Sequence, residues 1–89
     1  MNQPYLEVTF RHGRALAAYY YLPRPAGQKS YRSRRIEPGL VVDFDEHDRP
    51  IGIEITAPRL LTLEAFNSAL AEIGLGPVAQ AELAPLQAA

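Results

Sequence analysis

The sequence of 89 residues contains no cysteine, which excludes a disulfide framework and a thiolate metal site. It has no apolar run near the roughly 20 residues that a membrane-spanning helix needs. The first residues, MNQPYLEVTF, lack the long apolar centre of a signal peptide. We therefore expect one small cytoplasmic domain, for which self-association is the remaining common source of stability.

The common catalytic motifs are also absent from the sequence. No serine stands in a Gly-x-Ser-x-Gly elbow, and there is no glycine-rich phosphate loop. The two histidines, His12 and His47, lie beside expected turns and lack the i, i+4 spacing of a helical zinc site. We therefore expect a non-catalytic protein that carries no cofactor.

Acidic residues are missing between positions 11 and 35, a segment that holds seven of the nine Lys and Arg residues. Every acidic residue except Glu7 lies from Glu37 onward, although the net charge is only −1. This segregation predicts a nucleic acid partner, an acidic protein partner, or pairing between the two halves of the chain.

Alternating apolar residues predict two strands at the start of the chain. In the first, YLEVTF, the buried face consists of Leu6, Val8 and Phe10. In the second, ALAAYYYL, the more apolar register consists of Leu16, Ala18, Tyr20 and Leu22. Placing Leu16 opposite Phe10 predicts a three-residue turn with a bulge around Gly13. Tyr19 and Tyr21 then lie on the other face.

The segment from Ile36 to Ile55, IEPGLVVDFDEHDRPIGIEI, predicts a hairpin. One face is buried, and alternation places on it Leu40, Val42, Phe44, Ile51, Ile53 and Ile55. Pairing Phe44 with Ile51 leaves His47–Asp48 as a two-residue turn and sets Pro50 opposite Asp45.

The segments around this hairpin are less regular. Residues 23–30, PRPAGQKS, predict a loop, and YRSRRIE predicts a short basic strand at a sheet edge. Pro38–Gly39 is a turn dipeptide that precedes the hairpin.

A helix follows, with Thr62 as its N-cap and Gly74 as the residue that ends it. Its apolar stripe consists of Leu63, Phe66, Leu70 and Ile73. We therefore predict an α+β domain over residues 1–76: an antiparallel meander of four to five short strands, then one amphipathic helix packed on one sheet face. Residues 77–89 are predicted to be a partly ordered tail.

Three segments carry a resemblance to a known family: the Pro38-Gly39 turn, the strand pair VVDFDEHDRPIGIEI and the helix start LLTLEAF. They resemble the YuzE-like family of small bacterial proteins of unknown function. The strand ALAAYYYL is similar to an early strand of that family, so the resemblance spans Tyr5 to Leu75. Family members usually carry Asp-Gly where this chain has His47-Asp48. The resemblance implies a small α+β domain and brings no established activity or catalytic residues.

Three carboxylates of the hairpin are candidates for a metal site. Asp43 faces Gly52 and lies diagonally from Glu54, and Asp45 follows on the same predicted strand face. Carboxylate oxygens at this spacing suit Mg²⁺ or Ca²⁺. The simpler interpretation is a solvated strand face next to a turn.

The basic segment KSYRSRR is the candidate for nucleic acid binding. Its cations are Lys29, Arg32, Arg34 and Arg35. These side chains are suited to phosphate contacts, and Tyr31 is suited to base stacking. The near-neutral pI of about 6.1 argues against a dedicated nucleic acid binder.

The tyrosines favour a third interpretation, in which the protein binds another protein. One helix covers little more than two strands, so sheet area that includes Tyr19 and Tyr21 needs a further cover. Tyrosine is enriched in interface cores, and Tyr31 is a further candidate contact. We therefore predict a protein-interaction or regulatory module, antitoxin-like in one version, that acts as a homodimer or caps a protein partner.

Overall fold

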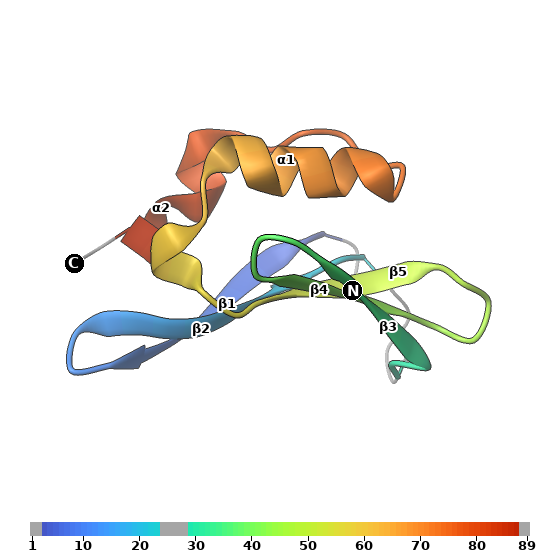
Figure 1. The fold of residues 1–89 in the computed structure, drawn as a ribbon, viewed down its shortest axis with the longest axis horizontal. Coiled ribbons are helices and arrows are strands. Elements are labelled where there is room, and N and C mark those ends of the chain that lie inside the picture. The colour runs from blue at the N-terminus through green and yellow to red at the C-terminus, as the bar shows by residue number, and fades with distance from the viewer. Residues whose placement is uncertain (1–2, 24–28, 88–89) are drawn as a thin grey trace.

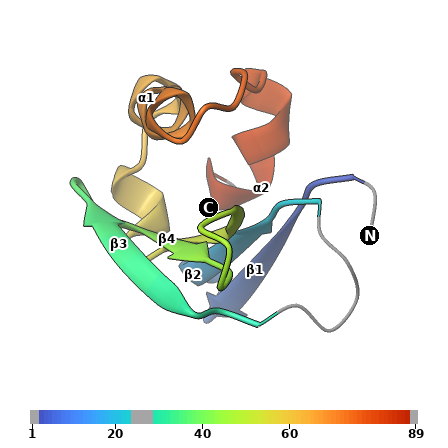
Figure 2. The ribbon, with the colours of Figure 1, turned by 90° about the vertical axis from the view of Figure 1, so that its right-hand side faces the viewer.

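The computed structural model describes residues 3–23 and 29–87, so the predicted loop at residues 23–30 lies partly outside the described residues. Its five-stranded antiparallel sheet has the order β1-β2-β5-β4-β3. The strands are β1 (Tyr5–Arg11), β2 (Arg14–Tyr21), β3 (Arg32–Ile36), β4 (Leu40–Phe44) and β5 (Pro50–Ile55). The helices are η1 (Pro58–Leu60), α1 (Leu63–Glu72), η2 (Gln80–Leu83) and α2 (Ala84–Gln87). The helices of this part of the chain lie on one face of the sheet (Figures 1 and 2), and the predicted α+β class is confirmed.

The sheet combines a hairpin, β1–β2, with a three-strand meander, β3–β4–β5. The two units join where β2 pairs with β5, from Ala18 opposite Ile55 to Tyr21 opposite Gly52. This order puts the mostly buried β5 in the centre and the largely exposed, basic β3 at an edge, as the sequence predicts for β3.

The β1–β2 turn differs from the prediction. It has two residues, His12 and Gly13, both with positive φ (53° and 76°), and the extra residue is a bulge in β2. The bulge sets Ala15 opposite Phe10, so Ala15 is 5% exposed and Leu16, predicted to be buried, is 55% exposed. Phe10 is also exposed, because this end of the hairpin extends beyond the helices (Figure 1).

The β4–β5 hairpin follows the predicted register from Leu40 opposite Ile55 to Asp43 opposite Gly52. The register then shifts, and Phe44 pairs with Pro50 instead of Ile51. The predicted two-residue turn is therefore wrong: the turn spans residues 46–48, and the Asp48 N–H donates to the Asp45 carbonyl (3.1 Å). Asp48 has a φ of 64°, as a type I turn followed by a left-handed residue requires.

Helix α1 begins and ends where the sequence predicts. The Ala65 N–H donates to the Thr62 hydroxyl (3.1 Å) at the start. At the end Gly74 has a φ of 81°, and the Leu75 N–H donates to the Leu70 carbonyl (2.9 Å). This Schellman arrangement satisfies carbonyls that the helix end leaves without partners.

The core lies between α1 and the sheet, and the C-terminal segment contributes to it. The fully buried residues include Leu40, Val42, Ile53, Ile55 and Phe66. Leu83 and Leu86 are also buried, and α2 contacts β2 and η1. The Asn67 side chain fixes the start of this segment, since it both accepts from the Val78 N–H (2.8 Å) and donates to the Val78 carbonyl (3.2 Å).

Residues 80–87 therefore cover a part of this sheet face that α1 alone does not cover. They belong to the predicted tail of residues 77–89, and two of its leucines, Leu83 and Leu86, are buried. In the described ranges no helix is both long enough and apolar enough to cross a membrane.

The corrected register predicts which apolar residues matter for stability. Ile53→Ala should lower the free energy of unfolding by about 2–5 kcal/mol, because it leaves a cavity in the core. Leu16→Ala should change it by no more than about 0.5 kcal/mol, because the side chain is exposed. Urea unfolding followed by circular dichroism measures both. Equal losses in the two variants would contradict the bulge at Leu16.

Candidate functional site

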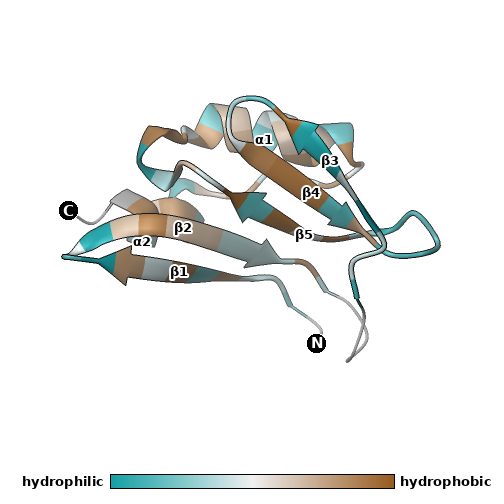
Figure 3. Cartoon of the chain, turned by 60° about the horizontal axis from the view of Figure 1, so that its bottom comes forward, coloured by the Kyte–Doolittle hydropathy of each residue, from teal (hydrophilic) through white to brown (hydrophobic). Residues whose placement is uncertain are grey.

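Strand register places tyrosines and charged residues on the sheet face opposite the helices, called the open face below. Figure 3 shows the strands from this side, with hydrophilic and hydrophobic stretches in the sheet. Strand register divides it into two rows that cross all five strands. One row consists of Tyr5, Tyr21, Gly52, Asp43 and Ser33. The other consists of Glu7, Tyr19, Glu54, Val41 and Arg35. Within the described residues no segment covers this face (Figure 2).

Three tyrosines on β1 and β2 form a continuous aromatic cluster, called the tyrosine ladder below. The rings of Tyr5 and Tyr21 stack with centroids 4.5 Å apart, and Tyr21 meets Tyr19 edge to face at 4.7 Å. The Tyr21 hydroxyl also donates to the Glu7 carboxylate (3.0 Å). The rings are therefore held in place from several sides. Tyr5, the outermost, is still 46% exposed.

Asp43 connects the tyrosine ladder to the basic edge of the sheet. Its Oδ2 accepts from the Tyr19 hydroxyl (2.7 Å), and its Oδ1 accepts from the Ser33 hydroxyl (2.6 Å). Both carboxylate oxygens therefore have partners from other strands. This network holds the Tyr19 ring across the central strand.

Gly52 provides the space that this crossing needs. A Cβ atom at position 52 would overlap the ring and the hydroxyl of Tyr19. A residue with a side chain would therefore displace Tyr19 and break its hydrogen bond to Asp43.

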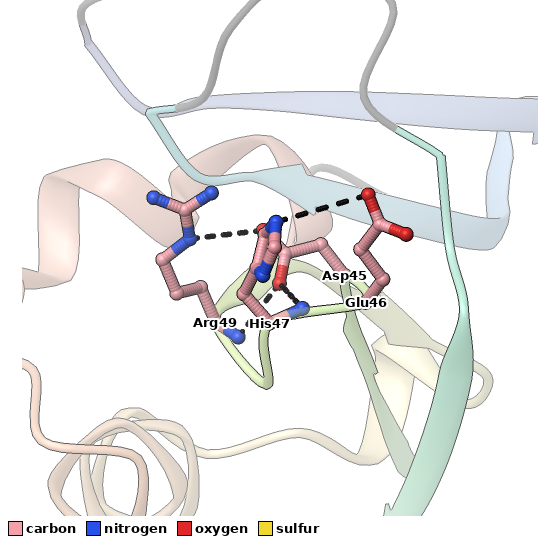
Figure 4. A network of polar contacts seen from close by, with 4 residues as sticks. All are labelled: Asp45, Glu46, His47 and Arg49. Atoms are coloured by element: carbon pink, nitrogen blue, oxygen red, sulfur yellow. Dashed lines mark hydrogen bonds and ion pairs between the residues drawn. The ribbon is translucent and has the colours of Figure 1, made fainter.

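Asp45 does not lie on the open face, where the sequence analysis placed it. It is 2% exposed and organises the β4–β5 turn (Figure 4). Its Oδ1 accepts from the N–H groups of His47 (2.8 Å) and Arg49 (2.9 Å), and its Oδ2 accepts from the Arg49 Nε (3.0 Å). Burial by itself raises the pKa of the Asp45 carboxyl. The two N–H groups and the guanidinium outweigh burial and hold the pKa below its ordinary value.

The candidate metal ligands are consequently separated. Asp43 belongs to the open-face network, Asp45 belongs to the turn, and Glu54 is exposed in the other row. In the part of the chain that the structure describes, no three Asp, Glu or His side chains are placed to hold a metal ion.

Two of the four cations of the basic segment pair with acidic residues of the same chain. Arg32 bonds to Asp48 (2.7 Å) and lies 4.3 Å from the centre of the Phe44 ring. Arg34 bonds to Glu72 (3.3 Å) at the end of α1. These pairs join the basic and acidic halves of the chain.

The other candidate residues of that segment, Lys29, Tyr31 and Arg35, are exposed. Lys29 and Arg35 form no ion pair within the described ranges. Tyr31 is 72% exposed, and no ring contact among the described residues joins it to Tyr19 or Tyr21.

The tyrosines can be predicted from the sequence, whereas the groups that hold Tyr19 in place, Asp43, Ser33 and Gly52, become visible only in the structure. The sequence around Ser33 and Gly52 does not mark either residue as part of a site. Their roles depend on the pairing of β2 with β5, a strand that is distant in sequence. Alternation identified the strand face, and it says nothing about which strands are adjacent.

Comparison with known proteins adds one similarity. Residues 17–57 match the family described as "Protein of unknown function (DUF2283)". The matched segment runs from the middle of β2 to just after β5, so it includes Tyr19, Asp43 and Gly52. No curated protein and no solved structure matches the chain. The similarity brings no described activity to the open face.

A double-mutant cycle tests the packing of Tyr19 over Gly52. Gly52→Ala should lower the free energy of unfolding by about 1–3 kcal/mol, because the added methyl group displaces the ring. In a Tyr19→Ala background the same change should have little effect, because the ring is absent. Urea unfolding of the four proteins gives the coupling energy. A cost that is equal in both backgrounds would show that the ring does not occupy this position.

Asp45 should make stability depend on pH. Because its folded pKa is lowered, its contribution is fully present above the unfolded pKa of about 3.9 and is lost as pH falls through the folded pKa. Asp45→Asn should therefore lower the melting temperature at pH 7, and the difference from the unmodified protein should shrink below about pH 4. Thermal unfolding at a series of pH values measures this. Glu46→Gln, an exposed neighbour in the turn, is the matched control and should show a much smaller effect.

Proposed function

We propose that the protein is a non-catalytic interaction module that binds a second copy of itself through the open face. The observation that carries the proposal is the tyrosine ladder, which lies on the sheet face without helices. Tyrosine gives a large contact area at a low cost in conformational entropy. Here the ring stacking and the bonds to Glu7 and Asp43 fix the rings before any partner arrives, and this lowers the entropy lost on binding.

The charges at the two edges of the open face favour a second copy as the partner. Glu7 on β1 and Arg35 on β3 end the same row, at opposite edges of the sheet. A twofold axis that runs parallel to the strands between the two open faces, opposite the central strand β5, would place β1 of one copy over β3 of the other. Each Glu7 then meets an Arg35 across the interface, and the pair occurs twice.

The area of the open face indicates how strong this dimer is. Five strands at a spacing of about 4.8 Å give a width of about 24 Å. Strands of five to eight residues give a length of roughly 17–26 Å. The two faces together would bury about 1,000 Å², near the lower limit for a specific interface. We therefore expect a dimer that dissociates on dilution.

A dimer of this strength suits a regulatory protein. In the version that we favour, the protein is a small bacterial regulator of the YuzE-like type, acts in the cytoplasm, and exchanges its second copy for a protein partner as an antitoxin does. The absence of cysteine fits a reducing compartment. The exposed Tyr31 lies next to β3 and would contribute to the rim of such a contact.

A charge exchange across the proposed interface tests the dimer. Glu7→Arg and Arg35→Glu should each weaken the dimer at least about tenfold, since each places like charges opposite one another. The double variant should restore much of the lost affinity, because the pair is rebuilt with reversed charges. Sedimentation velocity over a concentration series measures the dissociation constant.

Arg59→Glu is the matched control, because Arg59 is exposed and lies outside the open face. It should leave dimerisation unchanged. An unmodified protein that sediments as a monomer at every concentration would contradict the proposal. Single variants that weaken the dimer without rescue in the double variant would contradict the proposed geometry.

A further inference from the structure

A pocket of about 660 Å³ lies at one end of the sheet, away from the open-face network. The β1–β2 turn forms one wall, and the segment from Thr56 to Leu60, which connects β5 to η1 and includes it, forms another. In Figure 1 the blue hairpin projects beneath the yellow segment at this end of the molecule. Its volume is typical of small-molecule sites, which measure about 300–1,000 Å³.

Three arginines line the pocket: Arg11, Arg14 and Arg59. All ten acidic side chains of the sequence belong to the described residues. None of them forms an ion pair with these arginines. The ion pairs of the described chain use Arg32, Arg34, Arg49 and His47 instead.

The β1–β2 turn holds two of these cations close together. Arg11 pairs directly with Arg14 across the strands, so both side chains project from the same face of the hairpin. The turn between them is tight, with His12 and Gly13 both in the left-handed region. Like charges directly opposite in a strand pair repel one another, and a bound anion would remove this repulsion.

The pocket also has an apolar side. Leu16 and Leu60 line it and are exposed, Leu60 at 79%. Leu16 is exposed because the bulge turns it out of the core register. A ligand with an anionic group and an apolar or aromatic part would satisfy both sides.

We propose that this pocket binds a phosphorylated small molecule whose phosphate or diphosphate contacts the three arginines. The planar guanidinium donates paired hydrogen bonds to phosphate oxygens. Three positive charges match a diphosphate better than the single negative charge of a carboxylate. A nucleic acid backbone fits less well, because two cations of the basic segment, Arg32 and Arg34, are already paired with carboxylates of the same chain.

Isothermal titration calorimetry at low salt tests the proposal with pyrophosphate, ADP and uncharged adenosine as probes. Pyrophosphate and ADP should bind, and adenosine should not. The double variant Arg11→Gln with Arg14→Gln, and separately Arg59→Gln, should each weaken binding by about tenfold or more. The control Lys29→Gln removes an exposed cation that precedes β3 and does not line the pocket, and it should change affinity by less than about twofold.

The apolar wall gives a second and independent readout. Leu60→Ser should weaken ADP binding and leave pyrophosphate binding unchanged, because only ADP reaches the leucines. Circular dichroism should show the same fold for every variant, since the changed residues are exposed.

Four results would overturn the proposal. The first is no heat of binding with pyrophosphate or ADP, and the second is an equal loss of affinity in Lys29→Gln. The third is unchanged affinity in the arginine variants of the pocket. The fourth is binding of a single-stranded oligonucleotide or a glutamate-rich peptide without binding of pyrophosphate or ADP, which would assign the arginines to a macromolecular partner.

Discussion

The structure depends on the burial of one face of the β4–β5 pair. Leu40, Val42, Ile53 and Ile55 are completely buried there, and no other pair of strands is packed so fully within the described residues. Because side chains alternate along a strand, this burial determines which residues of the two strands point the other way. Asp43 is among them, so the core and the open-face network follow from the same register.

The position of β5 follows from the same requirement. A strand with so little exposed surface is best placed with neighbours on both sides, and β4 supplies only one. The β1–β2 hairpin supplies the other, which brings Tyr19 beside Glu54 and within reach of Asp43. The tyrosine ladder is thus connected to the other half of the chain by the arrangement that buries the core.

The pattern of apolar and polar residues predicts the regular parts of this fold, and it fails where a turn adds a residue. The register from Leu40 to Asp43, the caps of α1 and the basic edge strand all follow from the sequence. At Leu16 and at Asp45 the local turn geometry inserts a residue and moves a side chain to a different environment. Both changes alter a candidate site, because one exposes a residue that lines the pocket and the other removes a candidate metal ligand from the open face.

The candidate sites were harder to predict, because each combines segments that are distant in sequence. The alternation of side chains along β2 is enough to place Tyr19 and Tyr21 on the face away from the core. The partner Asp43 can be assigned only when β2 is known to lie beside β5. The pocket arginines come from two regions of the chain. The basic cluster predicted from the sequence consists of Lys29, Arg32, Arg34 and Arg35, and the fold pairs two of its members, Arg32 and Arg34, internally.

The charge segregation therefore has two physical outcomes. Ion pairs between the halves neutralise Arg32 and Arg34, and this requires carboxylates from the turn and from the end of α1. The β1–β2 turn extends beyond the helices (Figure 1), and its cations Arg11 and Arg14 form no ion pair with the acidic residues of the described chain. A surplus of like charge is unfavourable for the folded chain alone, and an external anion is the simplest way to offset it. The place where the fold leaves its own charges unbalanced is thus the place where we expect a charged ligand.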